Sequence, residues 1–161
     1  MLINDGDTVC IVGGGPGGSA CAMALLSEAR RVGRKIDVVL FEHKKFSEHR
    51  HYNQCIGVLS PPFEDILKNE LGLVLPDHLV LNDMEGYRLH SDLLSLDLIG
   101  EESGRSVSVT RSKFDAFMLE EAQKAGAQVV HDRVTSVEVN HDGVLVYSEG
   151  DNIKCAVVVG A

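Results

Sequence analysis

The chain has no tryptophan and contains only three tyrosines and five phenylalanines among its 161 residues. It has no run of 18 or more apolar residues, so we expect no transmembrane helix. Basic residues are also in the minority, with 15 Lys and Arg against 24 Asp and Glu, which gives a formal net charge of −9. Because nucleic acids and anionic membrane surfaces attract clustered basic residues, this balance argues against both as partners.

Cysteine is scarce and is not arranged in pairs. The four cysteines, Cys10, Cys21, Cys55 and Cys155, show no Cys-x-x-Cys spacing, and Cys10 and Cys155 lie in apolar runs typical of buried strands. We therefore expect reduced thiols in a cytoplasmic protein rather than a disulfide framework. The first apolar run is preceded by acidic rather than basic residues, which argues against a secretory signal.

Glycine, in contrast, is concentrated in one stretch, CIVGGGPGG at residues 10–18. The apolar, β-branched residues at 8–12 predict a buried strand before it, and small residues at helical spacing predict a helix over 17–31 after it. A second strand is predicted at 36–41. The order strand, turn, helix, strand predicts a right-handed parallel βαβ unit.

Three glycines of this stretch fit the spacing G-x-G-x-x-G, which is typical of dinucleotide-binding turns when a strand precedes it and a helix follows. Gly13 would permit the tight turn, Gly15 would let a pyrophosphate approach the backbone, and Gly18 would let the helix pack on the strand. The free N–H groups and the dipole of the helix favour phosphate charge at this point. Glu42, at the end of the second strand, is placed to accept hydrogen bonds from an adenosine ribose.

The remainder of the chain predicts a mixed α/β domain. A loop is expected at 43–62, helices at 63–71 and 111–125, two strands within 79–99, and further strands at 106–110, 127–131, 134–140, 144–149 and 153–159. The dipeptide Asp142-Gly143 between alternating runs predicts a hairpin, so the last three strands should form an antiparallel meander. The predicted fold class is α/β, a Rossmann-like βαβ parallel sheet with a three-stranded antiparallel β-meander.

Residues beyond the glycine turn resemble a flavoprotein family. They are Arg111-x-x-Phe114-Asp115 with Leu119, Ala122, Gly126-Ala127 and Val134, the closing VVVGA, and the central NQCIGVLS at 53–60. With the glycine turn, they are similar to the family that includes geranylgeranyl reductases, flavin-dependent halogenases and aromatic hydroxylases. The resemblance implies FAD as cofactor, NAD(P)H as a candidate electron donor, and, for the geranylgeranyl reductase branch, reduction of isolated C=C bonds in isoprenoid lipids. Hydroxylase or halogenase chemistry, and a nucleotide-binding module without catalytic activity, are the alternatives.

The same resemblance implies a set of site residues. The pyrophosphate of FAD would be held by Gly13, Gly15, Pro16, Gly17 and Gly18, with Gly160 of the closing strand also at the cofactor. Arg111 would lie near the pyrophosphate and ribityl chain, and Val134 would contact the adenine through its backbone. A solvated arginine at a helix start and an ordinary strand valine are the alternatives.

Cys55 is the catalytic candidate, because the family's Cys-Gly-Gly loop passes near the flavin ring. Here that loop reads Cys-Ile-Gly, and a plain loop cysteine is the alternative. The nearby His43, His49 and His51 match no closed zinc pattern with Cys55, so no metal site is predicted.

The closing VVVGA resembles the strand that runs into Ala-Asp-Gly in this family, and the sequence given stops at Ala161. We therefore expect residues 1–161 to be the FAD-binding part of a longer flavoprotein, inactive by itself. The substrate domain would be absent, and the substrate of the parent protein would be a small molecule or a lipid.

Overall fold

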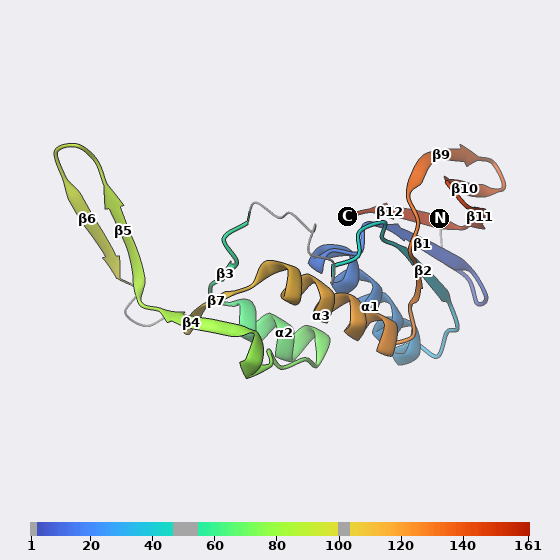
Figure 1. Ribbon diagram of the computed structural model, residues 1–161. Helices are drawn as coiled ribbons and strands as arrows, with labels where there is room; N and C mark the ends of the chain where they lie inside the picture. The colour runs from blue at the N-terminus through green and yellow to red at the C-terminus, as the bar shows by residue number, and fades with distance from the viewer. Residues whose placement is uncertain (1–2, 47–54, 100–103) are drawn as a thin grey trace. The chain divides into compact units, whose positions relative to one another are not determined.

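The computed structural model describes residues 3–46, 55–99 and 104–161, and the chain divides into two compact units (Figure 1). The first unit comprises residues 1–51 and 115–161, and the second comprises residues 52–114. The boundary falls within helix α3 (Arg111–Lys124). No helix of the described residues is long and apolar enough to cross a membrane.

The first unit is built on a four-stranded parallel sheet. Its strands are β1 (Thr8–Val12), β2 (Asp37–Phe41), β8 (Gln128–Val130) and β12 (Val157–Gly160), in the order β12-β1-β2-β8. Helix α1 (Pro16–Arg31) connects the two central strands. The predicted parallel βαβ unit is confirmed, because β1 pairs in parallel with both β2 and β12.

A three-stranded antiparallel meander completes this unit. It consists of β9 (Val134–Asn140), β10 (Gly143–Ser148) and β11 (Asn152–Cys155), in the order β11-β10-β9. Gly143 has a φ of +128°, a conformation that glycine adopts without steric cost, so the Asp-Gly turn forms the predicted hairpin.

The core of the first unit lies between the parallel sheet and the meander. It is formed by Cys10, Val39 and Phe41 from the sheet and by Val144, Val146 and Cys155 from the meander. Because successive side chains of a strand point to opposite faces, Ile11 and Leu40 lie on the other face of the sheet, where they are fully buried. Helix α1 contacts β1 and β2, and the meander occupies the first face, so α1 covers this second face.

The prediction of one continuous strand at 153–159 is wrong, because the structure divides this run into β11 and β12 at Ala156. Cys155 pairs with Val144 in the antiparallel meander, whereas Val157 pairs with Val9 in the parallel sheet. At the division, the N–H of Ala156 donates to the carbonyl of Thr8 at 2.8 Å. The run is apolar on both sides of this point and contains no breaker, so only the pairing partners separate the two strands.

The second unit has its own antiparallel sheet. Its strands are β3 (Val58–Leu59), β7 (Ser106–Val109) and β4 (Val80–Met84), in the order β3-β7-β4. Helix α2 (Phe63–Leu71) and a 3₁₀ turn (Asp77–Leu79) lie between β3 and β4 in the sequence. The predicted helix at 63–71 is thus confirmed, and β3 lies within the segment predicted as loop.

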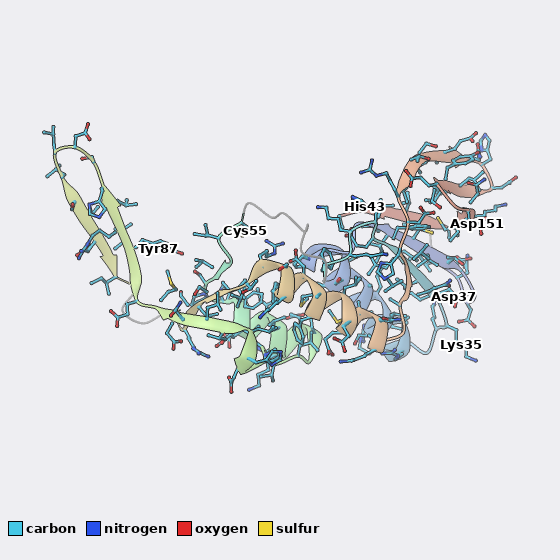
Figure 2. The ribbon with its side chains drawn as sticks, in the orientation of Figure 1. Lys35, Asp37, His43, Cys55, Tyr87 and Asp151 are labelled. Atoms are coloured by element: carbon cyan, nitrogen blue, oxygen red, sulfur yellow. The ribbon has the colours of Figure 1, made fainter. Side chains whose placement is uncertain are left out.

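A separate hairpin of β5 (Gly86–His90) and β6 (Ser95–Ile99) makes three strands where two were predicted within 79–99. One face of this hairpin pairs Tyr87 with Leu98 and Leu89 with Leu96, all well exposed, and Figure 2 shows Tyr87 on its strand. The opposite face carries an ion pair in which the guanidinium of Arg88 donates to the carboxylate of Asp97. Glu85 alone separates β4 from β5, so the boundary had too weak a turn signal to be predicted.

Candidate functional site

The turn between β1 and α1 contains two glycines that the protein's own packing requires. Gly13 has a φ of +113°, and a Cβ built on it would lie 2.3 Å from the carbonyl oxygen of Ala161. A Cβ on Gly18 would lie 1.8 Å from the carbonyl oxygen of Gly13. The turn therefore closes tightly on the end of β12, and the first turn of α1 packs directly on it. These are the structural roles that the G-x-G-x-x-G spacing predicted for both glycines.

At two other positions of the turn, packing within the described residues does not require glycine. Among residues 3–46, 55–99 and 104–161, a Cβ on Gly15 or Gly17 would meet no atom of another segment within 4 Å. The φ of Gly15 is −65°, which any residue adopts. Gly160, the last residue of β12, is equally open. The absence of side chains at these three positions therefore leaves free space beside the turn, as the close approach of a ligand to the backbone requires.

The N-terminus of α1 offers donors to that space. Gly15 is its N-cap and provides no side-chain cap, and the first turn of the helix has no acidic residue. In the part of the chain that the structure describes, the N–H groups of Gly15, Gly17 and Gly18 have no hydrogen-bond acceptor. Unpaired N–H groups and the positive end of the helix dipole together favour an anion.

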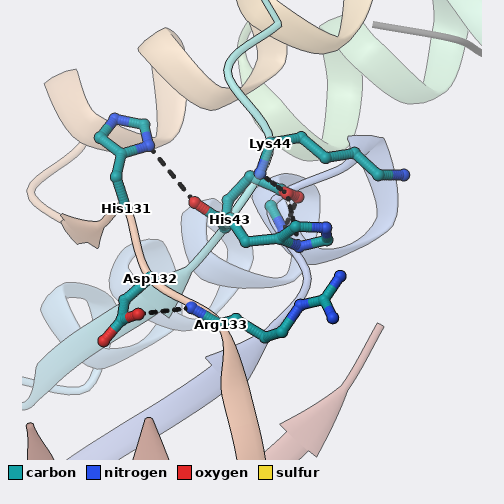
Figure 3. Close-up of polar contacts among 7 residues, drawn as sticks. His43, Lys44, His131, Asp132 and Arg133 are labelled. Carbon is teal, nitrogen blue, oxygen red and sulfur yellow. Dashed lines mark hydrogen bonds and ion pairs between the residues drawn. The ribbon is translucent and has the colours of Figure 1, made fainter. Parts of the chain in front are cut away.

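Glu42 follows β2 directly and lies against the glycine turn. The residue is only 6% exposed. Its Oε2 accepts a hydrogen bond from the N–H of Gly14 at 2.8 Å, and its Oε1 accepts one from the N–H of Lys44 at 2.7 Å (Figure 3). His43 places its Nδ1 3.6 Å from Oε1. The carboxylate is thus part of the turn's own structure, which the sequence pattern did not predict.

The carboxyl ends of the four parallel strands meet at one edge of the sheet. Gly13 follows β1, Glu42 follows β2, His131 follows β8, and Gly160 ends β12. The Nδ1 of His131 lies 3.3 Å from the carbonyl oxygen of Glu42, which joins the ends of β8 and β2 (Figure 3). This is the edge at which open α/β sheets bind their ligands. Neither Gly14 nor His131 was predicted as a site residue, although Gly14 is the middle residue of the GGG run.

Val134 begins β9 and packs half-buried against the core between the sheets. The structure therefore gives its side chain a packing role, and its predicted backbone contact with adenine stays a prediction. Pro16 is the first residue of α1. This position suits proline, which has no N–H, because an N–H there would find no acceptor within the helix.

Arg111 and Cys55 belong to the second unit, so their predicted roles beside a cofactor stay predictions. Arg111 is the first residue of α3. Cys55 is exposed at the start of the segment that leads to β3, and its Sγ accepts a hydrogen bond from the N–H of Gly57 at 3.4 Å (Figure 2). A Cβ on Gly57 would lie 2.0 Å from the carbonyl oxygen of Val109, so that glycine serves the unit's own packing.

One of the three histidines of the predicted loop at 43–62 lies among the described residues. His43 is described, whereas His49 and His51 lie outside the described residues. Within residues 3–46, 55–99 and 104–161, no three His, Cys, Asp or Glu side chains are grouped as a metal site would require.

The buried cysteines have the character expected of core thiols. Cys10 and Cys155 are free and buried, as the apolar runs predicted. Burial and the neighbouring Cys155 raise the pKa of the Cys10 thiol from 9.0 to about 12. A thiol with such a pKa stays protonated and is a poor nucleophile, so Cys10 has no part in the chemistry of the turn.

No model of a known protein family matches the chain. Among curated proteins, protein FixC of Escherichia coli K12 is a homologue, 30% identical over 92% of this chain and 35% of its own length. An uncharacterized protein encoded in the nifH2 5′ region of Methanosarcina barkeri is 29% identical over 95% of this chain and 80% of its own length. The chain spans about a third of the length of the FixC proteins that it matches.

Solved structures share the fold over nearly the whole chain. A geranylgeranyl bacteriochlorophyll reductase-like protein from Thermoplasma acidophilum has a TM-score of 0.72 at 23% identity, covering 99% of this chain and 40% of that protein. The flavin-dependent brominase Bmp2 has a TM-score of 0.75 at 23% identity over 96% of this chain and 37% of its own. A variant of halogenase PltM, solved in complex with FAD, has a TM-score of 0.70 at 19% identity, covering 98% of this chain and 34% of its own. The predicted fold class is confirmed: the chain has a flavin-dependent oxidoreductase- and halogenase-like fold.

Proposed function

We propose that the chain is the FAD-binding part of a flavin-dependent oxidoreductase. The observation that carries the proposal is the free space at Gly15, Gly17 and Gly160, at the carboxyl edge of the parallel sheet, which no atom of the described residues fills. The fold that the chain shares with flavin-dependent proteins, one of them solved with FAD, supports a flavin as the ligand of this edge.

The glycine turn would hold the pyrophosphate of FAD. The N–H groups of Gly15, Gly17 and Gly18 would donate to its oxygens, and the N-terminus of α1 would offset its charge. Because Gly13 and Gly18 already close the turn on Ala161, the donors need little rearrangement, which lowers the entropic cost of binding.

Glu42 and Val134 would hold the adenosine. Each carboxylate oxygen of Glu42 has one lone pair in use by a backbone N–H, so each can accept a further hydrogen bond from a ribose hydroxyl. The backbone of Val134, at the start of β9, would contact the adenine, and Arg111 would offset phosphate charge near the ribityl chain. The bound flavin supplies the hydride- or electron-transfer chemistry, and the residues of this chain bind and orient it.

The finer proposal is that the parent protein reduces C=C bonds in isoprenoid lipids, with NAD(P)H as electron donor. The resemblance of the Cys55 loop and the reductase-like neighbour from Thermoplasma acidophilum support this branch. Residues 1–161 would be the nucleotide-binding part, and the substrate-binding part would correspond to the remaining length of the FixC relatives. Flavin-dependent halogenation or hydroxylation is the second candidate, favoured by the TM-score of 0.75 with the brominase.

Titration of the purified chain with FAD tests the proposal. We expect the chain to retain FAD through gel filtration, with a visible flavin spectrum and altered flavin fluorescence. A preparation that stays colourless and leaves the fluorescence of added FAD unchanged would contradict the binding proposal for this chain.

The reaction of the parent protein needs separate assays. Saturation of a prenyl lipid in the presence of reductant supports the reductase, and a brominated or hydroxylated aromatic product supports the second candidate. FAD binding with neither product supports the non-catalytic module.

A further inference from the structure

The carboxylate of Glu42 serves the protein's own backbone in a way that a ribose contact does not require. Burial of a carboxylate is costly unless its oxygens are hydrogen-bonded. Glu42 is 6% exposed, and the N–H groups of Gly14 and Lys44 bond one oxygen each, at 2.8 and 2.7 Å. Within the described residues, no Lys or Arg side chain forms an ion pair with it. The N–H groups of Gly14 and Lys44 therefore offset the cost of burying this carboxylate.

Both the N–H and the carbonyl of Gly14 form hydrogen bonds to side chains. Its N–H donates to Glu42, and its carbonyl accepts a hydrogen bond from the Oγ of Ser19 at 3.0 Å. A Cβ at this position would lie 2.6 Å from the Cβ of Glu42 and 3.0 Å from the Cδ1 of Leu119. The middle residue of the GGG run is thus packed against Glu42, whereas the next residue, Gly15, faces open space.

Glu42 is itself fixed from the neighbouring strand. The Nδ1 of His131 lies 3.3 Å from its carbonyl oxygen, and its N–H donates to the carbonyl of Val130 at 3.0 Å. The turn is therefore connected through Glu42 to the ends of β2 and β8 without any ligand.

We propose that Glu42 is a positioning residue for the glycine turn: its carboxylate holds Gly14, and thereby the neighbouring donors at Gly15 and Gly17, in the phosphate-binding geometry before the cofactor arrives. This inference rests on the proposed function for the identity of the ligand, and it assigns Glu42 a role that is independent of the ribose. The preformed turn would bind a pyrophosphate with a smaller loss of backbone freedom.

The charge of Glu42 and its hydrogen bond to Gly14 should change the affinity for an anion in opposite directions. A carboxylate beside a pyrophosphate repels it, so loss of the charge at Glu42 should by itself strengthen the binding of an anion that has no ribose. Loss of the positioning hydrogen bond should instead weaken it. Inorganic pyrophosphate, which carries no ribose, therefore separates the two roles.

The test uses three variants of the complete 161-residue chain. Glu42→Ala removes both carboxylate oxygens, so the N–H groups of Gly14 and Lys44 both lose their acceptor. Ser19→Ala removes the other tether of Gly14 and leaves Glu42 unchanged. Asp37→Asn, an exposed position at the start of β2, is the matched control for loss of one negative charge.

Two measurements are made on each variant: amide hydrogen exchange of residues 13–15 by NMR without cofactor, and the Kd for inorganic pyrophosphate. Loss of a charge-assisted hydrogen bond predicts about tenfold faster exchange at Gly14 and about tenfold weaker pyrophosphate binding for Glu42→Ala. Ser19→Ala should change the exchange at Gly14 and the pyrophosphate Kd in the same direction but by smaller factors. Asp37→Asn should leave both quantities unchanged. Amides of the central strands should stay protected in all variants, which reports on folding.

Unchanged exchange at Gly14 in Glu42→Ala would overturn the positioning role. Pyrophosphate binding equal to or tighter than that of the wild-type chain would likewise leave Glu42 a ribose contact only. The exchange measurement needs no ligand, so it decides the inference even if the wild-type chain binds neither pyrophosphate nor FAD. Failure of the wild-type chain to bind FAD contradicts the proposed function alone.

Discussion

Replacing Gly15 and Gly18 in turn by alanine should separate cofactor binding from folding, although the two positions are three residues apart. A Cβ on Gly15 would meet no atom within 4 Å in the part of the chain that the structure describes, and the φ of −65° there suits alanine. We therefore expect Gly15→Ala to change the free energy of unfolding by less than about 1 kcal/mol. A Cβ on Gly18 would lie 1.8 Å from the carbonyl oxygen of Gly13, so the backbone must move, and Gly18→Ala should destabilise the chain by about 3 kcal/mol or more.

Gly15→Ala should weaken the binding of FAD even though it leaves the fold stable. A methyl group at residue 15 would occupy the space that the proposed pyrophosphate needs. Loss of two backbone hydrogen bonds to a charged phosphate, at about 1.5 kcal/mol each, sums to about 3 kcal/mol, or roughly a hundredfold weaker FAD binding. Urea denaturation followed by circular dichroism measures the stability of both variants, and flavin fluorescence titration measures the affinity of Gly15→Ala.

Gly17→Ala is the second open position and should behave like Gly15→Ala, with a stable fold and weakened FAD binding. FAD binding of Gly15→Ala equal to that of the wild-type chain would refute the assignment of the open space to the pyrophosphate. A Gly18→Ala variant as stable as the wild-type chain would refute the packing argument.

Three further predictions concern the stability of the fold. Burial raises the pKa of Cys10 in the folded state from 9.0 to about 12, so the contribution of this thiol to stability is complete below pH 9. The contribution is lost as pH rises toward 12, by at most about 1.4 kcal/mol per pH unit. Urea midpoints from pH 8 to 11 should therefore fall more steeply for the wild-type chain than for Cys10→Ala. Hydrogen bonds from Ser148 and from the N–H of Gly150 lower the pKa of Asp132 below 3.8, so this group contributes stability above that pH and loses it as pH falls through the folded pKa. The Tm of Asp132→Asn should therefore respond less than that of the wild-type chain between pH 5 and 3, and equal slopes would contradict the assignment. In the second unit, Gly57→Ala should destabilise the fold because its Cβ would lie 2.0 Å from a carbonyl oxygen, whereas the 81% exposed Ile56 should tolerate glycine with little change in Tm.

The sequence determined those features that depend on short-range patterns. The apolar β-branched run of β1, the small-residue face of α1 and the Asp-Gly turn of the meander each set a local conformation, so the parallel βαβ unit and the antiparallel meander could be predicted before the structure. The G-x-G-x-x-G spacing likewise indicated which glycines close the turn, because Gly13 and Gly18 act within six residues of each other.

Only the tertiary structure decided the features that depend on residues far apart in the chain. The apolar run at 153–159 becomes two strands because Val144 pairs with one half and Val9 with the other. The open space at Gly15 follows from where the other described segments lie, because none of them comes within 4 Å of a Cβ built there. Gly14 and Glu42 are 28 positions apart, and their hydrogen bond exists because parallel pairing of β1 and β2 brings both strand ends to one edge of the sheet. Sequence patterns report the conformation of each segment, whereas contacts of this kind follow from which segments pair.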